Sequence, residues 1–218
     1  MGKALFSISE RKKVAFSKGN LQHQASTGRW RFAEHQFDFV GEENANASPD
    51  YDGWIDLFDW ETGNNPNNPI VGGEECRHWR LLDQNEWGYL CYERETESGI
   101  RFAKAKVHGV NGLVIVPDDW DGSDYGFDNA DEEQSSFEDN IISDEQWDVL
   151  DEIGVVFLPA AGYHCDGVHN VGKHGTYWTS SPMGMEGAMH FVFSEKDFFT
   201  DELDRFYGCS VRLVRRAR

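Results

Sequence analysis

The sequence lacks three features that would each have indicated a class of function. Its four cysteines form no CxxC pair, so neither a redox motif nor a zinc knuckle is indicated, and the thiols are expected to be reduced. No apolar run reaches the roughly eighteen residues that a membrane-spanning helix needs, so we expect no membrane insertion. Basic residues are few, 20 against 39 acidic ones, and they form no stripe. We therefore expect no nucleic-acid partner, because such binding requires Lys and Arg to neutralise phosphates.

The overall composition favours one folded domain. The chain has 218 residues, of which 39% are hydrophobic and 14% aromatic, including eight Trp. This is enough to build a large core, so disorder over the whole chain is not expected. The start, Met1 to Phe6, has no apolar stretch of signal-sequence length, which predicts a soluble chain that is not exported by the Sec route. A signal removed beforehand would leave the same picture.

Local patterns predict two helices and several short strands. Asp83 followed by Glu86, and Ser143 followed by Gln146, resemble capping boxes, and Gly154 is placed to end the second helix. The Gly-, Asn- and Pro-rich stretch from Gly63 to Gly73 predicts a loop. Strands are expected at Val14–Phe16, Trp30–Ala33, Leu113–Val116, Val155–Leu158, Met189–Phe193 and Ser210–Val214. Together these elements predict an α+β fold class.

An acidic block extends from Asp118 to Glu152, and no Lys or Arg occurs between Lys106 and Lys173. Such a block is usually a solvated surface. The alternative is calcium, whose preferred oxygen ligands could come from Asp119, Asp121, Asp124 and Asp128. An EF-hand needs glycine at its sixth position, and counting from Asp119 that position is Asp124. The pattern for calcium is therefore weak.

Two ordinary strand-like segments near the C-terminus frame a chemically mixed stretch. The frames are Gly175 to Ser181 and Gly208 to Val214, and the irregular stretch between them runs from Pro182 to Tyr207. It contains almost every kind of side chain. A fixed frame with an irregular filling is typical of a scaffold that holds a recognition surface rather than a catalytic centre.

The order of several short motifs resembles one known family. These motifs are Phe16-Ser17-Lys18-Gly19-Asn20-Leu21-Gln22, Trp30-Arg31-Phe32-Ala33-Glu34-His35-Gln36, Trp54-Ile55-Asp56-Leu57-Phe58, Trp79-Arg80-Leu81-Leu82, Glu86-Trp87, Phe157-Leu158-Pro159-Ala160-Ala161-Gly162-Tyr163 and the two C-terminal frames. The chain thus resembles, over nearly its whole length, the C-type-lectin-fold variable proteins encoded beside diversity-generating retroelements in gut Bacteroidetes and their phages. That fold is related to the fold of formylglycine-generating enzyme.

The resemblance implies a single C-type-lectin-like domain over residues 1–218, with the N- and C-terminal strands side by side. It also implies a variable segment at about 175–214 that displays side chains to a protein or glycan ligand on a cell surface. In such systems reverse transcription miscopies template adenines and rewrites chosen codons. Because no signal sequence is seen, we expect a location in a phage virion, in the cytoplasm, or on a surface through a partner.

The expected contact residues lie within or beside the variable segment. They are Thr176, His190, Ser194, Asp197, Phe198, Thr200, Asp201, Asp204, Phe206 and Cys209, of which Thr176 is a weaker candidate, as is Lys173 beside them. For Phe198, Phe199 and Phe206, a place in the core is an equal alternative to a place on the surface. Arg212 is expected to be either an ion-pair partner or exposed. The buried support is expected from Tyr177, Trp178, Phe191, Val211 and Leu213.

One departure bears on whether this copy is diversified. Mutating the adenines of an AAC codon cannot produce Met, Glu or Lys, so Met183, Met185, Glu186 and Lys196 did not arise in that way. Other template codons or fixed positions would account for them. The sequence therefore leaves open whether this chain is an active target or a relative that is not diversified.

Two other functions stand beside ligand display. His164, Cys165, His169 and His174 form the densest group of soft-metal ligands, but their spacing fits no familiar zinc site and no orienting third group accompanies a Cys-His pair. We therefore expect neither an enzyme nor a bound cofactor. The other alternative is a structural module of a virion or a cell surface, with the acidic block as a contact or calcium face.

Overall fold

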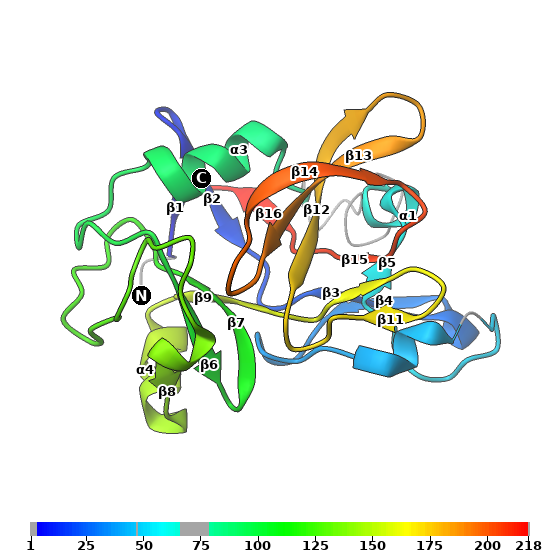
Figure 1. Ribbon diagram of the computed structural model, residues 1–218, viewed down its shortest axis with the longest axis horizontal. Helices are drawn as coiled ribbons and strands as arrows, with labels where there is room; N and C mark the ends of the chain where they lie inside the picture. Colours follow the sequence, from blue (N-terminus) through cyan, green and yellow to red (C-terminus); the bar gives the residue numbers. More distant parts are fainter. Residues whose placement is uncertain (1–3, 47, 66–78, 218) are drawn as a thin grey trace.

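The computed structural model describes residues 4–46, 48–65 and 79–217 (Figure 1). Cys76 and most of the predicted glycine-rich loop, from residue 66 onward, lie outside the described residues. The fold combines short helices with many strands, most of them paired antiparallel, which confirms the α+β class. Among the described residues we find no helix with the length and hydropathy that crossing a membrane requires.

The two main helices begin where the sequence predicts them. In α3 (Gln84–Gly88) the Asp83 carboxylate accepts from the Glu86 N–H at 2.8 Å, and the Glu86 carboxylate accepts from the Asp83 N–H at 3.1 Å. Ser143 and Gln146 form the same reciprocal pair at the start of α4 (Asp144–Glu152). Both predicted capping boxes are confirmed. The other helical segments in the described part of the chain are η1 (Ala25–Thr27), η2 (Gly41–Ala45), α1 (Trp60–Gly63), the π-helical η3 (Tyr89–Glu93) and η4 (Phe137–Asp139).

The C-terminal sheet has the strand order β14-β13-β12-β15-β5. Its strands are β5 (Leu57–Phe58), β12 (Gly175–Met183), β13 (Gly187–Phe193), β14 (Phe198–Asp204) and β15 (Cys209–Ser210). The expectation of an irregular stretch from Pro182 to Tyr207 is wrong, because β13 and β14 pair antiparallel over all seven residues of each. The hydrophobic pattern of the sequence did not predict β14, because the C-terminal half of this strand is acidic and exposed instead of apolar.

The second C-terminal frame is also different from the expected single strand. Ser210 to Val214 is divided between β15 and β16 (Val214–Arg216), which belong to different sheets. β16 pairs antiparallel with β2 (Lys12–Phe16), with Val214 opposite Phe16, and β2 pairs with β1 (Phe6–Ser9). The chain therefore brings its N- and C-terminal strands side by side, as the resemblance implies.

A four-stranded sheet with the order β8-β6-β7-β9 forms a second layer. It consists of β6 (Phe102–Val107), β7 (Val110–Ile115), β8 (Ile141–Ile142) and β9 (Val156–Pro159). Trp147 and Leu150 of α4 cluster with Ala105, Val107 and Phe157 of this sheet. The two remaining antiparallel pairs are β3 (Leu21–Gln24) with β4 (Arg29–Phe32), and β10 (Tyr163–His164) with β11 (Val168–His169).

The centre of the C-terminal sheet is buried on both faces. On one face Tyr177 and Phe191 join a cluster with Trp87 of α3, whose ring stacks on Phe191 at 4.6 Å. On the other face Trp178 clusters with Phe58. The five residues expected to be buried support, Tyr177, Trp178, Phe191, Val211 and Leu213, are all at most 2% exposed, which confirms that prediction. Exposure in this sheet is thus confined to its edge and to the ends of its strands.

Arg212 lies inside the molecule, so both expectations for it are wrong. It is 1% exposed, and no carboxylate of the described residues lies in ion-pair contact with it. Its guanidinium donates to Asn20 Oδ1 at 3.3 Å and to Gln36 Oε1. Gln36 in turn donates to Asp151 Oδ1 at 2.6 Å. Burial lowers the pKa of Arg212 to about 10.

Candidate functional site

The edge strand β14 carries most of the exposed side chains of the C-terminal sheet. In Figure 1 it passes along the outer side of the β12–β13 hairpin. We call its exposed residues, together with the exposed residue just after the strand, the β14 surface: Phe199, Asp201, Glu202, Asp204 and Phe206. Phe199 is 44% exposed and Phe206 67% exposed. Strand alternation places Phe199 and Asp201 on one face of β14 and Glu202 and Asp204 on the other, so this surface presents aromatic rings and carboxylates around the edge of the sheet.

The ten predicted contact residues divide between surface and core. Exposed are Asp201, Asp204 and Phe206; half-buried are Asp197 and Thr200; buried are Thr176, His190, Ser194, Phe198 and Cys209. The buried five cannot belong to an open face, so the expected exposure is wrong for Thr176, His190, Ser194 and Cys209, whereas for Phe198 the core alternative is confirmed. Lys173, the weaker candidate, is exposed. Whether the exposed residues bind a ligand stays a prediction.

These predicted contact residues are buried because the central strands of the sheet are covered on both faces. Phe198 opposes Phe193, and its ring stacks on Phe102 at 4.1 Å. His190 of β13 is 8% exposed, and desolvation lowers its pKa. Cys209 is fully buried, which raises the pKa of its thiol. Of the three phenylalanines with two interpretations, Phe198 is core, whereas Phe199 and Phe206 are surface.

Ser194 shapes the turn between β13 and β14. Its hydroxyl donates to Asp197 Oδ2 at 2.7 Å and accepts from the backbone N–H groups of Lys196 and Asp197, at 3.1 and 2.9 Å. Such a hydroxyl replaces backbone hydrogen bonds that a tight turn leaves unmade. Ser194 is thus a structural residue of this turn.

The outer edge of β14 is partly capped by side chains. Tyr92 OH donates to the Phe198 carbonyl at 2.9 Å, and Asp201 Oδ1 accepts from the Glu202 N–H at 2.8 Å. Gln84 of α3 donates to Thr200 Oγ1 at 3.4 Å. Occupied edge groups and charged side chains oppose the addition of another strand. Recognition at this strand would therefore use side chains rather than strand pairing.

Arg205 fixes the C-terminal end of β14. Its guanidinium donates to the carbonyls of Gly187 and Gly184, at 2.9 and 3.1 Å, and to Glu61 Oε1 at 2.9 Å. It also lies 4.3 Å from the ring centroid of Trp60. The β12–β13 turn, α1 and the end of β14 are thereby held together. The backbone under Asp204 and Phe206 is consequently well supported.

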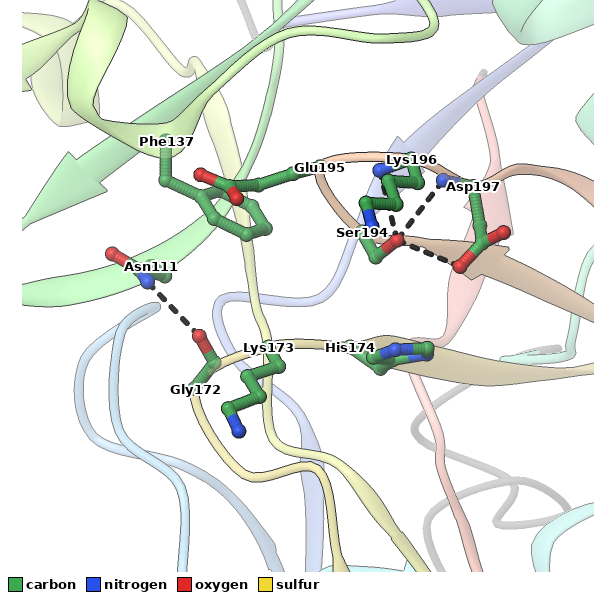
Figure 2. A pocket seen from close by; sticks show the side chains of 9 residues that line it. All are labelled: Asn111, Phe137, Gly172, Lys173, His174, Ser194, Glu195, Lys196 and Asp197. Carbon is green, nitrogen blue, oxygen red and sulfur yellow. Dashed lines mark hydrogen bonds between the residues drawn. The ribbon is translucent and has the colours of Figure 1, made fainter.

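A cavity of about 320 Å³ lies at the opposite end of the sheet, beside the β13–β14 turn (Figure 2). Its lining includes Asn111 of β7, Phe137 of η4, Gly172 and Lys173 before β12, and Glu195 of the turn. In the view of Figure 2 the Glu195 side chain projects across the Phe137 ring, whereas Lys173 points away from both. Two predicted residues, Ser194 and Asp197, also line it, with His174 and Lys196.

A buried lysine lies close to this turn. Lys104 of β6 is 1% exposed, and its ammonium donates to the Glu133 carbonyl at 2.6 Å. Desolvation lowers its pKa to about 8, and the nearby carboxylates of Glu195 and Asp197 oppose that shift. The charge of Lys104 is therefore balanced by acidic residues from two segments.

The predicted metal ligands do not converge. His169 Nε2 lies 2.8 Å from the carbonyl oxygen of Cys165, a contact within the β10–β11 hairpin. Asp119, Asp121 and Asp124 line a hollow of about 250 Å³ together with Trp120. In the part of the chain that the structure describes, no three His, Cys, Asp or Glu side chains are placed to hold a metal ion. Neither the calcium nor the soft-metal alternative gains a site there.

Sequence reasoning missed several residues of these surfaces. Glu202 belongs to the β14 surface, although strand alternation places its side chain on the face of the buried Phe198, so the sequence pattern does not indicate its exposure. Asn111 and Glu195 line the cavity through pairings far apart in the chain, for which the sequence carries no local signal. Comparisons with protein-family models, with curated proteins and with solved structures give no match to this chain.

Proposed function

We propose that this chain is a non-catalytic ligand-binding protein of the C-type-lectin fold, of the kind diversified by retroelements. In this proposal the β14 surface is the recognition surface, and its ligand is a protein or glycan on a cell surface. The family assignment rests on the order of the sequence motifs and on the adjacent terminal strands, which is an argument from likeness.

One observation carries the proposal: exposed and mixed side chains lie directly beside a strand that is wholly buried. All seven residues of β13 are buried, while β14, paired to it along its length, exposes four of its seven. Replacing exposed side chains usually changes the free energy of unfolding by less than about 0.5 kcal/mol. Truncating buried ones costs roughly 2–5 kcal/mol. The architecture therefore suits residues that change on a frame that does not.

The chemistry of the β14 surface also suits binding. Phe199 and Phe206 offer large rigid contact areas at a small cost in side-chain entropy, as aromatic residues do in antibody loops. Asp201 adds a directional acceptor on the same face of the strand as Phe199, and Glu202 and Asp204 add acceptors on the opposite face. The Arg205 interactions reduce the ordering that binding would otherwise require.

The proposal predicts a specific arrangement in the DNA that flanks the gene. A near-copy of the codons for residues 175–214 should stand beside a reverse-transcriptase gene and differ from them mainly at adenines. Such a copy with differences spread evenly over all four bases would contradict diversification. Binding is tested separately on a glycan array and on immobilised cell-surface proteins.

The binding test compares two matched variants. Exchanging Phe199, Asp201, Glu202, Asp204 and Phe206 together for Ser should abolish any interaction found on those arrays while the melting temperature stays nearly unchanged. Exchanging the exposed Val149 and Asp148 of α4 should leave binding intact. Retained binding by the first variant would contradict the proposed surface.

A further inference from the structure

Three large apolar side chains are exposed together at one end of the C-terminal sheet. Met185 is 92% exposed and Met183 49% exposed, both at the β12–β13 turn, and Phe206 is 67% exposed in the turn that follows β14. We call these three residues the hairpin-tip patch. The β12–β13 turn protrudes from the rest of the molecule in Figure 1, which leaves the patch accessible to a partner of protein size.

Arg205 holds the two turns of the hairpin-tip patch together. Its backbone N–H donates to the Glu186 carbonyl at 2.8 Å, and its guanidinium donates to two further carbonyls within two residues of Glu186. Met185 and Phe206 each adjoin one residue of this bonded pair in the sequence. Both side chains are therefore presented from one fixed unit, so binding would order little additional backbone. Large apolar side chains that gather at an exposed site mark a surface for another molecule, whereas single ones do not.

Carboxylates flank the hairpin-tip patch. Glu186 and Asp204 are both exposed. β13, β14 and the two turns of the patch contain no Lys or Arg apart from Arg205. The guanidinium of Arg205 is already in an ion pair with Glu61, at 2.9 Å. The surface therefore has an apolar centre and a negatively charged border.

We propose that the hairpin-tip patch docks a basic amphipathic helix of a partner protein. One face of such a helix would place apolar side chains on the patch, and its Lys and Arg side chains would meet Glu186 and Asp204. Methionine suits this role, because its unbranched and polarisable side chain adapts to apolar partners of different shapes. The inference rests on the proposed function, since Phe206 and Asp204 belong to the β14 surface, and it specifies the chemistry of the protein ligand.

The charge of this surface favours such a helix over other occupants. A second copy of the chain would bring the same carboxylates against each other, and an anionic membrane would repel them. Addition of a strand is opposed by the capped edge of β14. A basic partner, in contrast, is attracted from a distance by the net charge of −19.

The test titrates the full chain with three fluorescent peptides of about 18 residues, long enough to form a helix, and follows their fluorescence anisotropy. The first peptide carries Leu and Trp on one helical face and Lys and Arg on the other. The second keeps the apolar face and has Glu in place of every Lys and Arg, and the third keeps the basic residues and has Ser in place of the apolar ones. We expect the first peptide to bind saturably with a Kd below about 100 µM, and the other two to bind at least about tenfold more weakly.

Matched variants locate the binding site. Met183→Ser combined with Met185→Ser replaces only exposed side chains, so the melting temperature should stay nearly unchanged while the affinity for the first peptide falls at least about tenfold. Val149→Ser, on α4, also replaces an exposed apolar side chain and should bind the peptide like the unmodified chain. Glu186→Gln combined with Asp204→Asn should weaken binding at about 20 mM NaCl and have little effect at about 500 mM, because salt screens exposed charges.

Several results would overturn the inference. They are equal affinity for the basic and the acidic peptide, unchanged affinity of the variant at Met183 and Met185, and tighter binding to phosphatidylcholine vesicles than to the first peptide. Self-association of the chain that the same variant abolishes would assign the patch to a second copy instead. An array ligand that requires the β14 surface but neither methionine would overturn this inference alone and leave the proposed function standing.

Discussion

At the scale of single residues, the interior holds ionisable groups whose partners are neutral. Asp56 is fully buried; its Oδ1 accepts from Asn44 Nδ2 at 2.8 Å and its Oδ2 from the Val40 N–H at 2.9 Å. Asn44 returns the contact by accepting from the Asp56 and Leu57 N–H groups, at 2.8 and 3.0 Å. These bonds attach the η2 segment to β5. Desolvation nevertheless outweighs them and raises the pKa of Asp56 to about 6.

This pKa predicts a pH dependence of stability. Asp56 binds its proton more tightly in the folded than in the unfolded chain, so its favourable contribution is complete below the unfolded pKa of 3.8 and is lost as the pH rises through about 6. Relative to Asp56→Asn, the unmodified chain should lose about 2.4 kcal/mol of unfolding free energy between pH 4 and pH 7. Denaturant unfolding of both chains at several pH values measures this difference. A difference independent of pH would show that Asp56 titrates normally.

At the scale of elements, local signals predicted the helix starts and most strands, but they did not predict how strands pair. The two capping boxes depend on residues three positions apart, so the sequence contains them whole. The sequence did not predict β14, because its polar side chains reflect its position at the edge of the sheet. Only the pairing with β13 determines that position. For the same reason His190 and Cys209 were expected at the surface and lie buried. The sequence predicted the exposed residues of the candidate site only where their exposure did not depend on contacts with residues far away in the chain.

Gly88, at the last position of α3, offers a stabilising substitution. Its backbone is helical, with φ −57° and ψ −49°, and an added Cβ would meet no atom within 4 Å. Gly88→Ala should therefore raise the unfolding free energy by about 0.5–1 kcal/mol, because alanine loses less backbone entropy. Thermal and denaturant unfolding check the value. A lower stability would mean that the helix does not continue into η3 as described.

Gly175, at the first position of β12, offers the opposite case. A Cβ there would lie 2.1 Å from Cζ of Phe193, which is fully buried and cannot move aside freely. Gly175→Ala should cost about 1–3 kcal/mol, the usual range for overpacking a core. The same unfolding assays measure it, with Gly88→Ala as the control for a glycine at which the added methyl group meets no atom. An unchanged stability would contradict the close pairing of β12 and β13 at this point.

At the scale of the whole molecule, an excess of acidic residues acts on a fold whose core is divided into three clusters. With a net charge of −19, the acidic side chains repel one another in the compact folded state. Few cations offset it, and the ion pairs of Arg94 and Lys13 both converge on one carboxylate, Asp118. Long-range repulsion is therefore expected to outweigh local attraction.

Salt should accordingly stabilise the protein. Raising NaCl from about 10 mM to about 150 mM shortens the screening length from about 30 to about 8 Å. We expect the melting temperature to rise by about 2–4 °C, which corresponds to roughly 1 kcal/mol for a chain of this size. In a variant carrying Asp119→Asn, Asp124→Asn and Glu152→Gln, the gain should be smaller. A melting temperature that falls with salt would mean that ion pairs dominate.

The most direct test of the central claim is to compare the stability of two combinatorial libraries by protease resistance of the displayed protein. One library randomises the β14 surface: Phe199, Asp201, Glu202, Asp204 and Phe206. The other randomises Tyr177, Phe191, Phe193, Phe198 and Val211, which are all buried. We predict that most members of the first fold with changes within about 0.5 kcal/mol per substitution, and that nearly all members of the second fail to fold. Comparable losses in both libraries would contradict a replaceable surface on a fixed frame.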